Sequence, residues 1–325
     1  MKRKSVDKIF GALLCAAAIN FAAAQPYPSK PIRLIIPYPA GSSSNDIIGR
    51  VLAQRLSGAL GQQVVVDNRA GAGGNLGSEM GAKAAPDGYT LLLGTNGPLA
   101  ISPSVYSKLG YDSVRDLTPI AMVALVPYIV IVHPSVPATN VRELIALAKS
   151  KPGQLYFGST GSGGTPHLCF ELFKHMAGID IVHVPYKGGA PAMNDLLGGQ
   201  VQMYCTGVTA ALQFVKAGRL RAIGMATLKR SELLPELATI SEQGLAGFDV
   251  ASWISIHGPA KLPQPIVQRL YQEIAKIVES PDMRQYILGQ GSQPALMDPQ
   301  QLDAYLRAEI AKWAKVVKAA NVRLD

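Results

Sequence analysis

Short apolar runs alternate with amphipathic segments along the chain from residue 32 onward. Apolar positions three and four residues apart in SNDIIGRVLAQRLSGALG (44–61) predict a helix with one buried face. The small-residue segment GNLGSEMGAKAAPDG (74–88) predicts a second helix, ended by Pro86. Buried strands are predicted at IRLIIPY (32–38), VVVDN (64–68) and TLLLGT (90–95). Short apolar strands separated by helices predict a parallel α/β sheet.

The same alternation repeats after the apolar run LTPIAMVALVPYIVIVHP (117–134). Strands are expected at LYFGS (155–159), DIVHVPY (180–186), VQMYCTG (201–207) and RLRAIGMAT (219–227). Helices are expected at 141–151, 163–178, 190–199, 263–280 and 298–320. The last helix carries a clear start signal, with Asp298 as N-cap and Pro299 at its first position.

Two α/β units of this kind predict two lobes. The units are separated by the apolar runs VALVPYIVIVH (123–133) and FDVASWISIHG (248–258) rather than by a Gly/Ser/Pro linker. If the C-terminal helices return to the first unit, the lobes share two connecting strands and a cleft. We therefore expect lobe 1 to comprise residues 25–124 plus 250–325 and lobe 2 to comprise residues 125–249.

The N-terminal 24 residues predict a signal peptide. A basic MKRK start precedes the apolar IFGALLCAAAINF, and Ala22 to Ala24 give an A-x-A cleavage site before Gln25. No later run reaches the roughly 18 apolar residues of a membrane span. We expect cleavage near Ala24/Gln25 and export to the periplasm.

Composition and charge restrict the partners. The chain is 48% hydrophobic and 16% charged, which is typical of a globular protein. Four basic residues and one acidic residue in the N-terminal segment account for +3 of the formal charge of +9 and leave +6. This excess is scattered, without basic blocks or interleaved aromatics, so we expect no nucleic-acid partner. A diffuse positive field weakly favours anionic ligands.

Two cysteines, Cys169 and Cys205, remain after cleavage. One lies on a predicted helix and the other on a predicted strand, so a disulfide and two buried thiols both remain open. No C-x-x-C or H-E-x-x-H spacing occurs, and we expect neither a metal site nor a cofactor.

Two glycine- and serine-rich loops are the candidate binding elements. PAGSSSND (39–46) and STGSGGTPH (159–167) each follow a predicted strand and lead into a helix. Ligands of parallel sheets bind beyond the carboxyl ends of strands, where loop amides and helix N-termini attract anions. Glycines let a ligand approach the backbone closely. Asp46 is interpreted as a helix cap. Together the loops predict a two-sided anion clamp.

Enzyme motifs do not fit the chain. No G-x-S-x-G elbow and no G-x-x-x-x-G-K-[ST] loop occurs, and GAGGNLG (71–77) lacks the dinucleotide spacing. His167 beside Ser162 suggests a hydrolase triad, but no acid is matched to it, so we interpret His167 as a hydrogen-bonding group. A secreted hydrolase using these two residues is the rival to a non-enzymatic binding protein.

The chain resembles the solute-binding proteins of tripartite tricarboxylate transporters, known as the Bug family. The resemblance covers nearly the whole chain from YPSKPIRLIIPYPAG onward and is most specific at NRAGAGGN (68–75) and VPYKGGAPA (184–192). It implies a type II periplasmic-binding-protein fold, two Rossmann-like α/β lobes closing on a cleft. It also implies that both loops hold one carboxylate of the ligand through amides, hydroxyls and waters.

The resemblance implies a receptor that passes a di- or tricarboxylate or an aromatic acid to membrane permease subunits. A ligand-sensing adaptor for a membrane sensor kinase is the alternative, and we expect a monomer. Relatives often carry an Asp-Asn or Asp-Thr pair where this chain has Thr206 and Gly207, which favours a plain acid over an amino acid. The expected ligand contacts, none of them catalytic or metal-binding, are Tyr38, Ala40, Gly41, Ser42, Ser43, Ser44, Asn45, Thr95, Asn96, Ser159, Thr160, Gly161, Ser162, Gly163, Gly164, Thr165, His167, Tyr186, Cys205 and Thr206.

Overall fold

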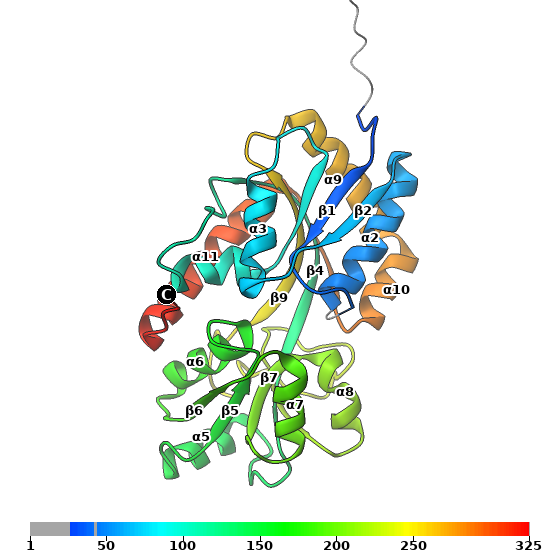
Figure 1. Cartoon of the computed structure of the whole chain (residues 1–325). Helices are drawn as coiled ribbons and strands as arrows, with labels where there is room; N and C mark the ends of the chain where they lie inside the picture. Colours follow the sequence, from blue (N-terminus) through cyan, green and yellow to red (C-terminus); the bar gives the residue numbers. More distant parts are fainter. Residues whose placement is uncertain (1–26, 42–43, 325) are drawn as a thin grey trace, which may run out of the picture.

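The computed structural model describes residues 27–41 and 44–324. Figure 1 shows two lobes, one above the other, joined by strands that run between them. The upper lobe combines the N-terminal strands with the C-terminal helices α9 (Gln264–Glu279), α10 (Pro281–Gly289) and α11 (Pro299–Ala320). The lower lobe holds the middle of the chain. The predicted alternation of strands and helices is therefore observed as a two-lobed α/β architecture.

The sheet of lobe 1 begins with three parallel strands, which are followed by an antiparallel strand. β1 (Ile32–Ile36) lies between β2 (Val64–Asn68) and β3 (Thr90–Gly94) and pairs parallel with both. β9 (Ala251–Pro259) pairs antiparallel with β3. Because β1, β2 and β3 are parallel, their carboxyl ends meet at one edge of the lobe.

Lobe 2 repeats this arrangement with β5 (Tyr156–Ser159) between β6 (Val182–Pro185) and β7 (Met203–Gly207), all parallel. β8 (Arg221–Met225) pairs antiparallel with the connecting strand β4 (Leu117–Val132). The full pairing order is β2-β1-β3-β9-β4-β7-β5-β6, so both lobes are linked through one hydrogen-bonded path.

The long strand β4 changes partners where the lobes meet. Residues from Leu117 to Pro127 pair with β9, whereas those from Tyr128 to Val132 pair with β7 and β8. β10 (Gln293–Met297) also pairs with the lobe 1 part of β4. The apolar run predicted to connect the units is thus one continuous strand with two sets of neighbours.

Helices follow most of the parallel strands. Their bounds are α2 (Ser44–Leu60), α3 (Asn75–Ala82), α4 (Ser102–Val105), α5 (Val141–Ser150), α6 (Thr165–Ala177), α7 (Gly189–Leu197) and α8 (Val208–Lys216), with short turns η1 (Ala72–Gly74) and η2 (Gly97–Ile101). The capping box at Asp298 confirms the predicted start of α11. The expectation that Pro86 ends the second helix is wrong, because α3 already stops at Ala82.

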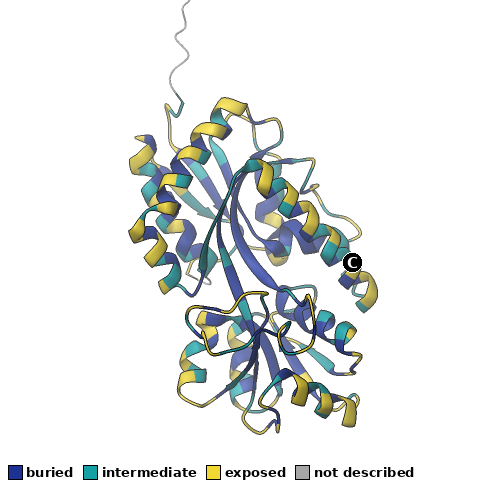
Figure 2. Ribbon diagram, turned by 180° about the vertical axis from the view of Figure 1, so that it is seen from behind, coloured by how far each residue is buried: buried dark blue, intermediate teal, exposed yellow. Residues whose placement is uncertain are grey.

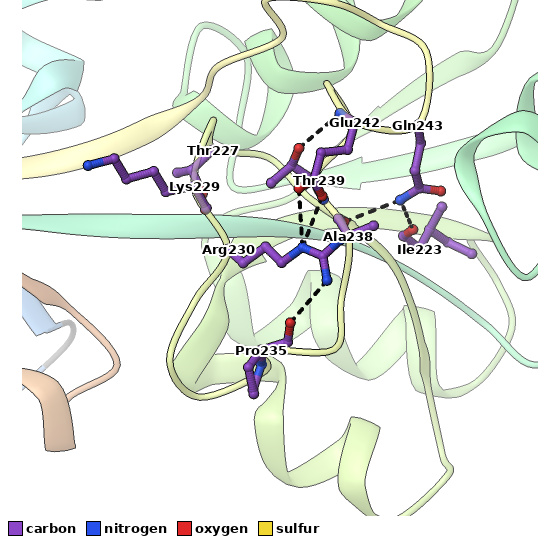
Figure 3. Close-up of polar contacts among 9 residues, drawn as sticks. All are labelled: Ile223, Thr227, Lys229, Arg230, Pro235, Ala238, Thr239, Glu242 and Gln243. Carbon is purple, nitrogen blue, oxygen red and sulfur yellow. Dashed lines mark hydrogen bonds and ion pairs between the residues drawn. The ribbon is translucent and has the colours of Figure 1, made fainter.

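The connection from β8 to β9 forms no helix or named strand and is held by polar contacts instead (Figure 3). Arg230 pairs with Glu242 and donates to the Pro235 carbonyl at 3.2 Å. Gln243 donates to the carbonyls of Ile223, at 2.9 Å, and Ala238, at 3.2 Å. These contacts satisfy backbone groups that a sheet or helix would otherwise pair.

Burial is concentrated in the strands that join the lobes. Figure 2 shows dark blue residues along the central strands and yellow residues on the outer faces of the helices. Trp253 on β9 and Trp313 on α11 are fully buried in one cluster.

A disulfide joins Cys169 on α6 to Cys205 on β7, with Cα atoms 6.5 Å apart. Of the two alternatives left open by the sequence, the structure has the disulfide.

Candidate functional site

Each lobe carries one of the two glycine- and serine-rich loops. The first follows β1 in lobe 1 and the second follows β5 in lobe 2 (Figure 1). Asn96, just after β3, donates from Nδ2 to Thr165 Oγ1 at 2.9 Å, which joins the strand ends of both lobes directly. The carboxyl ends of the parallel strands therefore meet where ligands of such sheets bind.

Asp46 is the polar centre of the first loop. Its carboxylate accepts from the Gly41 N–H at 2.7 Å, from Asn68 Nδ2 at 2.7 Å and from Arg50 Nε at 2.9 Å. Asp46 lies inside the first turn of α2 rather than before the helix, so it does not occupy the N-cap position that we expected. Its side chain holds the loop closed onto the helix and onto β2.

The buried carboxylate of Asp46 is stabilised in its charged form. Burial alone would raise its pKa, but hydrogen bonds from Arg50, Gly41 and Asn68 outweigh that effect and lower the pKa below the usual range. Asp46 therefore brings a negative charge beneath the loop, and Arg50 neutralises it. Neither side chain is free to attract or repel a ligand strongly.

The other residues of the first loop lie at the surface of lobe 1. Ala40 and Gly41 are exposed, whereas Ser44 and Asn45 are half-buried. Tyr38 and Thr95 share a hydrogen bond of 2.6 Å between their hydroxyl oxygens, which couples the ends of β1 and β3. Ser42 and Ser43, both expected to contact the ligand, lie outside the described residues.

The second loop is supported by neutral groups. Ser159 Oγ lies 2.6 Å from His183 Nε2 and accepts from the Gly161 N–H at 3.1 Å. The Gly163 N–H donates to His167 Nδ1 at 3.0 Å. The Gly164 N–H also donates, to the Gly161 carbonyl at 3.4 Å, so all three of the loop's glycine amides are engaged internally. Those of Ser162 and Thr165 have no acceptor among the described residues, which leaves them for a ligand.

The imidazoles of His167 and His183 stack beneath this loop, with ring centroids 3.8 Å apart. Burial, followed by repulsion from His183 and Lys174, lowers the pKa of His167 to about 3. Burial and Lys174 lower the pKa of His183 to about 4. Both rings are therefore neutral near pH 7, and His167 can accept the Gly163 N–H.

His167 lies under the loop and not in the cleft. Its Nδ1 is used by Gly163, and its Nε2 lies 3.7 Å from Glu171 Oε1. Its ring packs in the core of lobe 2, and its expected contact with a ligand stays a prediction. In the described part of this loop the hydroxyl beside a histidine is that of Ser159, next to His183, so the rival hydrolase pair of Ser162 and His167 is not assembled.

Asn96 and Cys205, both expected ligand contacts, are engaged within the protein. Asn96 Nδ2 donates to Thr165 and to the Ala251 carbonyl, while its Oδ1 accepts from Ser252, so the amide is used between the lobes. Cys205 is buried in the disulfide with Cys169. Sequence alone had no means of showing these partners, and the contact of either residue with a ligand stays a prediction.

Tyrosines from both lobes surround the junction. Tyr128, on β4, was missed by sequence reasoning because it sits inside an apolar run. Burial, with the nearby Tyr204 and Tyr38, raises its pKa, and a hydrogen bond with Thr165 opposes that rise. Tyr186 donates to Asp195 at 2.7 Å. Tyr128 is a polar residue within the apolar run, at the point where β4 stops pairing with β9 and begins to pair with β7. That polar position was the signal that could have identified it.

The remaining expected contacts follow the strands of lobe 2. Ser162 and Thr160 are exposed on the second loop, and Gly164 is half-buried where α6 begins. Thr206, the residue before the last of β7, has 7% of its surface exposed and lies near Tyr204, whose pKa burial raises to about 12. Helices α6, α7 and α8 all start at this edge, so three positive helix ends point toward the junction.

The arrangement offers hydroxyls, amides and helix ends, which suits an anion held without a formal countercharge. Within the described ranges, 27–41 and 44–324, no group of three His, Cys, Asp or Glu side chains is placed to hold a metal ion. In the same ranges no helix has both the length and the apolar character needed to cross a membrane.

Known proteins share this architecture. A family model described as tripartite tricarboxylate transporter family receptor, TctC, matches residues 48–322. Protein BugT of Bordetella pertussis is 36% identical over 318 residues, which cover 97% of each chain. The structure titled R. palustris Rpa4515 with adipate has a TM-score of 0.82 at 37% identity, over 91% of this chain and 99% of that one.

A more distant neighbour is MatC (Rpa3494) from Rhodopseudomonas palustris with bound malate. It has a TM-score of 0.77 at 27% identity, over 90% of this chain and 100% of the other. The family model covers the second loop and starts just after the first, while BugT is similar over 97% of the chain. This chain therefore belongs to the tripartite tricarboxylate transporter receptor family, two-lobed periplasmic solute-binding proteins that are not enzymes.

Proposed function

We propose that this receptor captures a small carboxylate between the second loop and the first. The observation that carries the proposal is the loop at Ser159 to Thr165, in which two neutral imidazoles hold Ser159 and Gly163 while no acceptor is found for the Ser162 and Thr165 amides among the described residues. The positive end of α6 begins at the same place. The similar structures with adipate and malate support an acid of this size.

The ligand is proposed to be a plain di- or tricarboxylate or an aromatic acid. Thr206 is neutral, so lobe 2 provides no carboxylate at this position to pair with a ligand's amine. Tyr38, Tyr128 and Tyr204 place phenol rings around the junction, and such rings can donate to an acid or stack on an aromatic one. Ser42 and Ser43 remain proposed contacts of the first loop.

A thermal-shift screen of the chain from residue 25 tests the proposal. The panel contains adipate, malate, citrate, nicotinate and terephthalate, with alanine, arginine and glucose as controls. A ligand at 100 times its dissociation constant adds about 2.7 kcal/mol to stability when it binds only the folded state. We expect one acid class to raise the melting temperature while the controls do not.

Isothermal titration then confirms one site per chain for the acid that shifts. Unfolding and refolding the protein before the screen removes any ligand that was retained during purification. A shift with an amino acid or sugar and none with any acid would overturn the carboxylate assignment and leave the family assignment unaffected.

We further propose that the exported monomer delivers its ligand to the permease subunits of a tripartite tricarboxylate transporter. The family description supports this partner. Deleting the gene should abolish uptake of the radiolabelled acid identified above, and restoring it should recover uptake. Normal uptake with loss of an acid-induced transcriptional response would favour the sensor-kinase alternative instead.

A further inference from the structure

The segment that follows α11 reaches from lobe 1 to the second ligand loop. α11 ends at Ala320, and Asn321, with a φ of 51°, turns the chain back. Val322 then donates to the Val317 carbonyl at 3.2 Å, which closes the helix end. In Figure 1 the red end of this helix lies beside α6 of lobe 2.

Leu324 is anchored on lobe 1. Its N–H donates to the carbonyl of Val105, the last residue of α4, at 3.0 Å. Its side chain is half-buried and packs on the hydrophobic cluster that contains Val105. The backbone bond fixes where this side chain points, although the segment itself forms no helix or strand.

The partner of Leu324 across the junction is Gly163. A Cβ atom added to Gly163 would lie 2.6 Å from Leu324 Cδ1 and 3.1 Å from Val105 Cγ1. The φ of Gly163 is 76°, which favours glycine. Its N–H is held from within lobe 2 by His167. Gly163 is therefore enclosed by a neutral imidazole on one side and two apolar side chains of lobe 1 on the other.

We propose that Leu324 is a positioning residue for the second ligand loop. This inference rests on the carboxylate-binding function proposed above. Contact with Leu324 limits the excursions of Gly163, whose neighbours Ser162 and Thr165 present the amides for the acid. A loop already ordered before the ligand arrives loses less conformational entropy on binding, which raises affinity. The contact also joins this loop to lobe 1 on the α11 side.

The test compares Leu324→Ala with Val322→Ala in the chain from residue 25. Val322 packs on the same cluster but is not among the residues nearest to a Cβ atom added at Gly163, so it controls for general loss of packing. Hydrogen exchange of the peptide covering residues 159–168 is measured without ligand. We expect exchange about fivefold faster at the Gly163 amide in Leu324→Ala. Val322→Ala should match the wild type there, and Leu324→Met should restore protection.

Adipate titration gives the functional readout. Leu324→Ala should bind adipate about fivefold more weakly than Val322→Ala does. Unchanged exchange at residues 159–168 in Leu324→Ala would overturn the inference. If the wild type binds no acid at all, the proposed function fails, and the exchange experiment still decides whether Leu324 positions the loop.

A double substitution tests the contact itself. Gly163→Ala places a methyl group against Leu324, so combining it with Leu324→Ala should recover part of the stability that the single Gly163→Ala change loses. Combining Gly163→Ala with Val322→Ala should give no such recovery. Simple additivity in both pairs would show that the two residues do not interact and would contradict the inference.

Discussion

The loop between β1 and α2 and the loop between β5 and α6 occupy matching positions in the two lobes but have different supports. In lobe 1 a buried charge, Asp46, holds the loop through Gly41 and is compensated by Arg50. In lobe 2 two uncharged histidines hold the loop through Ser159 and Gly163. The second loop is also packed against the other lobe, through Leu324.

This difference shows that one sequence pattern can be fixed by different chemistry. Hydrogen bonds to the charged Asp46 carboxylate are individually strong, but the buried charge must be balanced by an opposite charge, which Arg50 supplies at the surface. A neutral support places no charge beside the acid that we propose to bind there, so the positive end of α6 would act on that acid without an opposing charge from the support. We infer that lobe 2 supplies most of the anion affinity and lobe 1 completes the cleft.

The largest effect is expected from Gly163→Val. The branched side chain would meet Leu324 and Val105 in a backbone conformation that strongly disfavours it, at a cost of about 2 to 4 kcal/mol. Titration should detect no acid binding, while circular dichroism still shows a folded protein. Gly178→Val is the matched control, because Gly178 has a similar φ, 62°, with nothing within 4 Å of an added Cβ. Equal affinities in both variants would remove the second loop from the site.

Asp46→Ala should have the next largest effect, on stability. It removes three hydrogen bonds to a buried carboxylate, which we expect to cost about 2 to 3 kcal/mol in urea denaturation. Asp303→Ala is the matched control, since Asp303 pairs with Arg307 at the same spacing on an exposed helix face and should cost under about 1 kcal/mol. If both variants lose a similar amount of unfolding free energy, the Asp46 carboxylate does not hold the first loop.

The histidine support predicts a pH dependence that the charged support does not share. Burial lowers the pKa of His167 to about 3, whereas an unfolded histidine titrates near pH 6.5. The unfolded state therefore binds more protons between these values, so this contribution to stability is full above about pH 6.5 and falls as pH decreases toward 3. His183 and His257, with pKa values of about 4 and about 3, act in the same direction.

His167→Asn isolates this contribution, because asparagine retains an acceptor for Gly163 but does not titrate. The loss of unfolding free energy between pH 7 and pH 5 should be smaller than in the wild type by about 1 to 2 kcal/mol. Urea denaturation at both pH values measures it. Identical losses in the two proteins would show that His167 is not held neutral in the folded state.

The smallest effect is expected from Thr165→Val, which removes the acceptor of the bond from Asn96 between the lobes. Stability should fall by about 1 kcal/mol, and acid binding should weaken. Thr118→Val also removes one neutral hydrogen bond, to Pro259 within lobe 1, and should lose similar stability without losing affinity. Weaker binding in both variants would indicate a general loss of stability rather than a specific link between the lobes.

Local pattern was sufficient for most of the elements, although it did not predict α4, α10 or β10. Hydrophobic periodicity, glycine-rich turns and the capping signal at Asp298 depend only on residues close together in the sequence, so they can be recognised without a structure. They predicted the alternating strands and helices and placed both loops at strand ends. The family resemblance, carried by stretches spread over nearly the whole chain, then gave the two-lobed fold that the structural comparisons confirm.

The partner of each polar side chain was decided only by the tertiary structure. Asn96 and Thr165 lie 69 residues apart, and Ser159 and His183 lie 24 apart, so no periodicity links them. The same holds for the disulfide of Cys169 with Cys205. Such pairs depend on strand register and on how one lobe packs against the other. For this reason the sequence by itself placed the binding loops, whereas folding determined which of their groups remain free for a ligand.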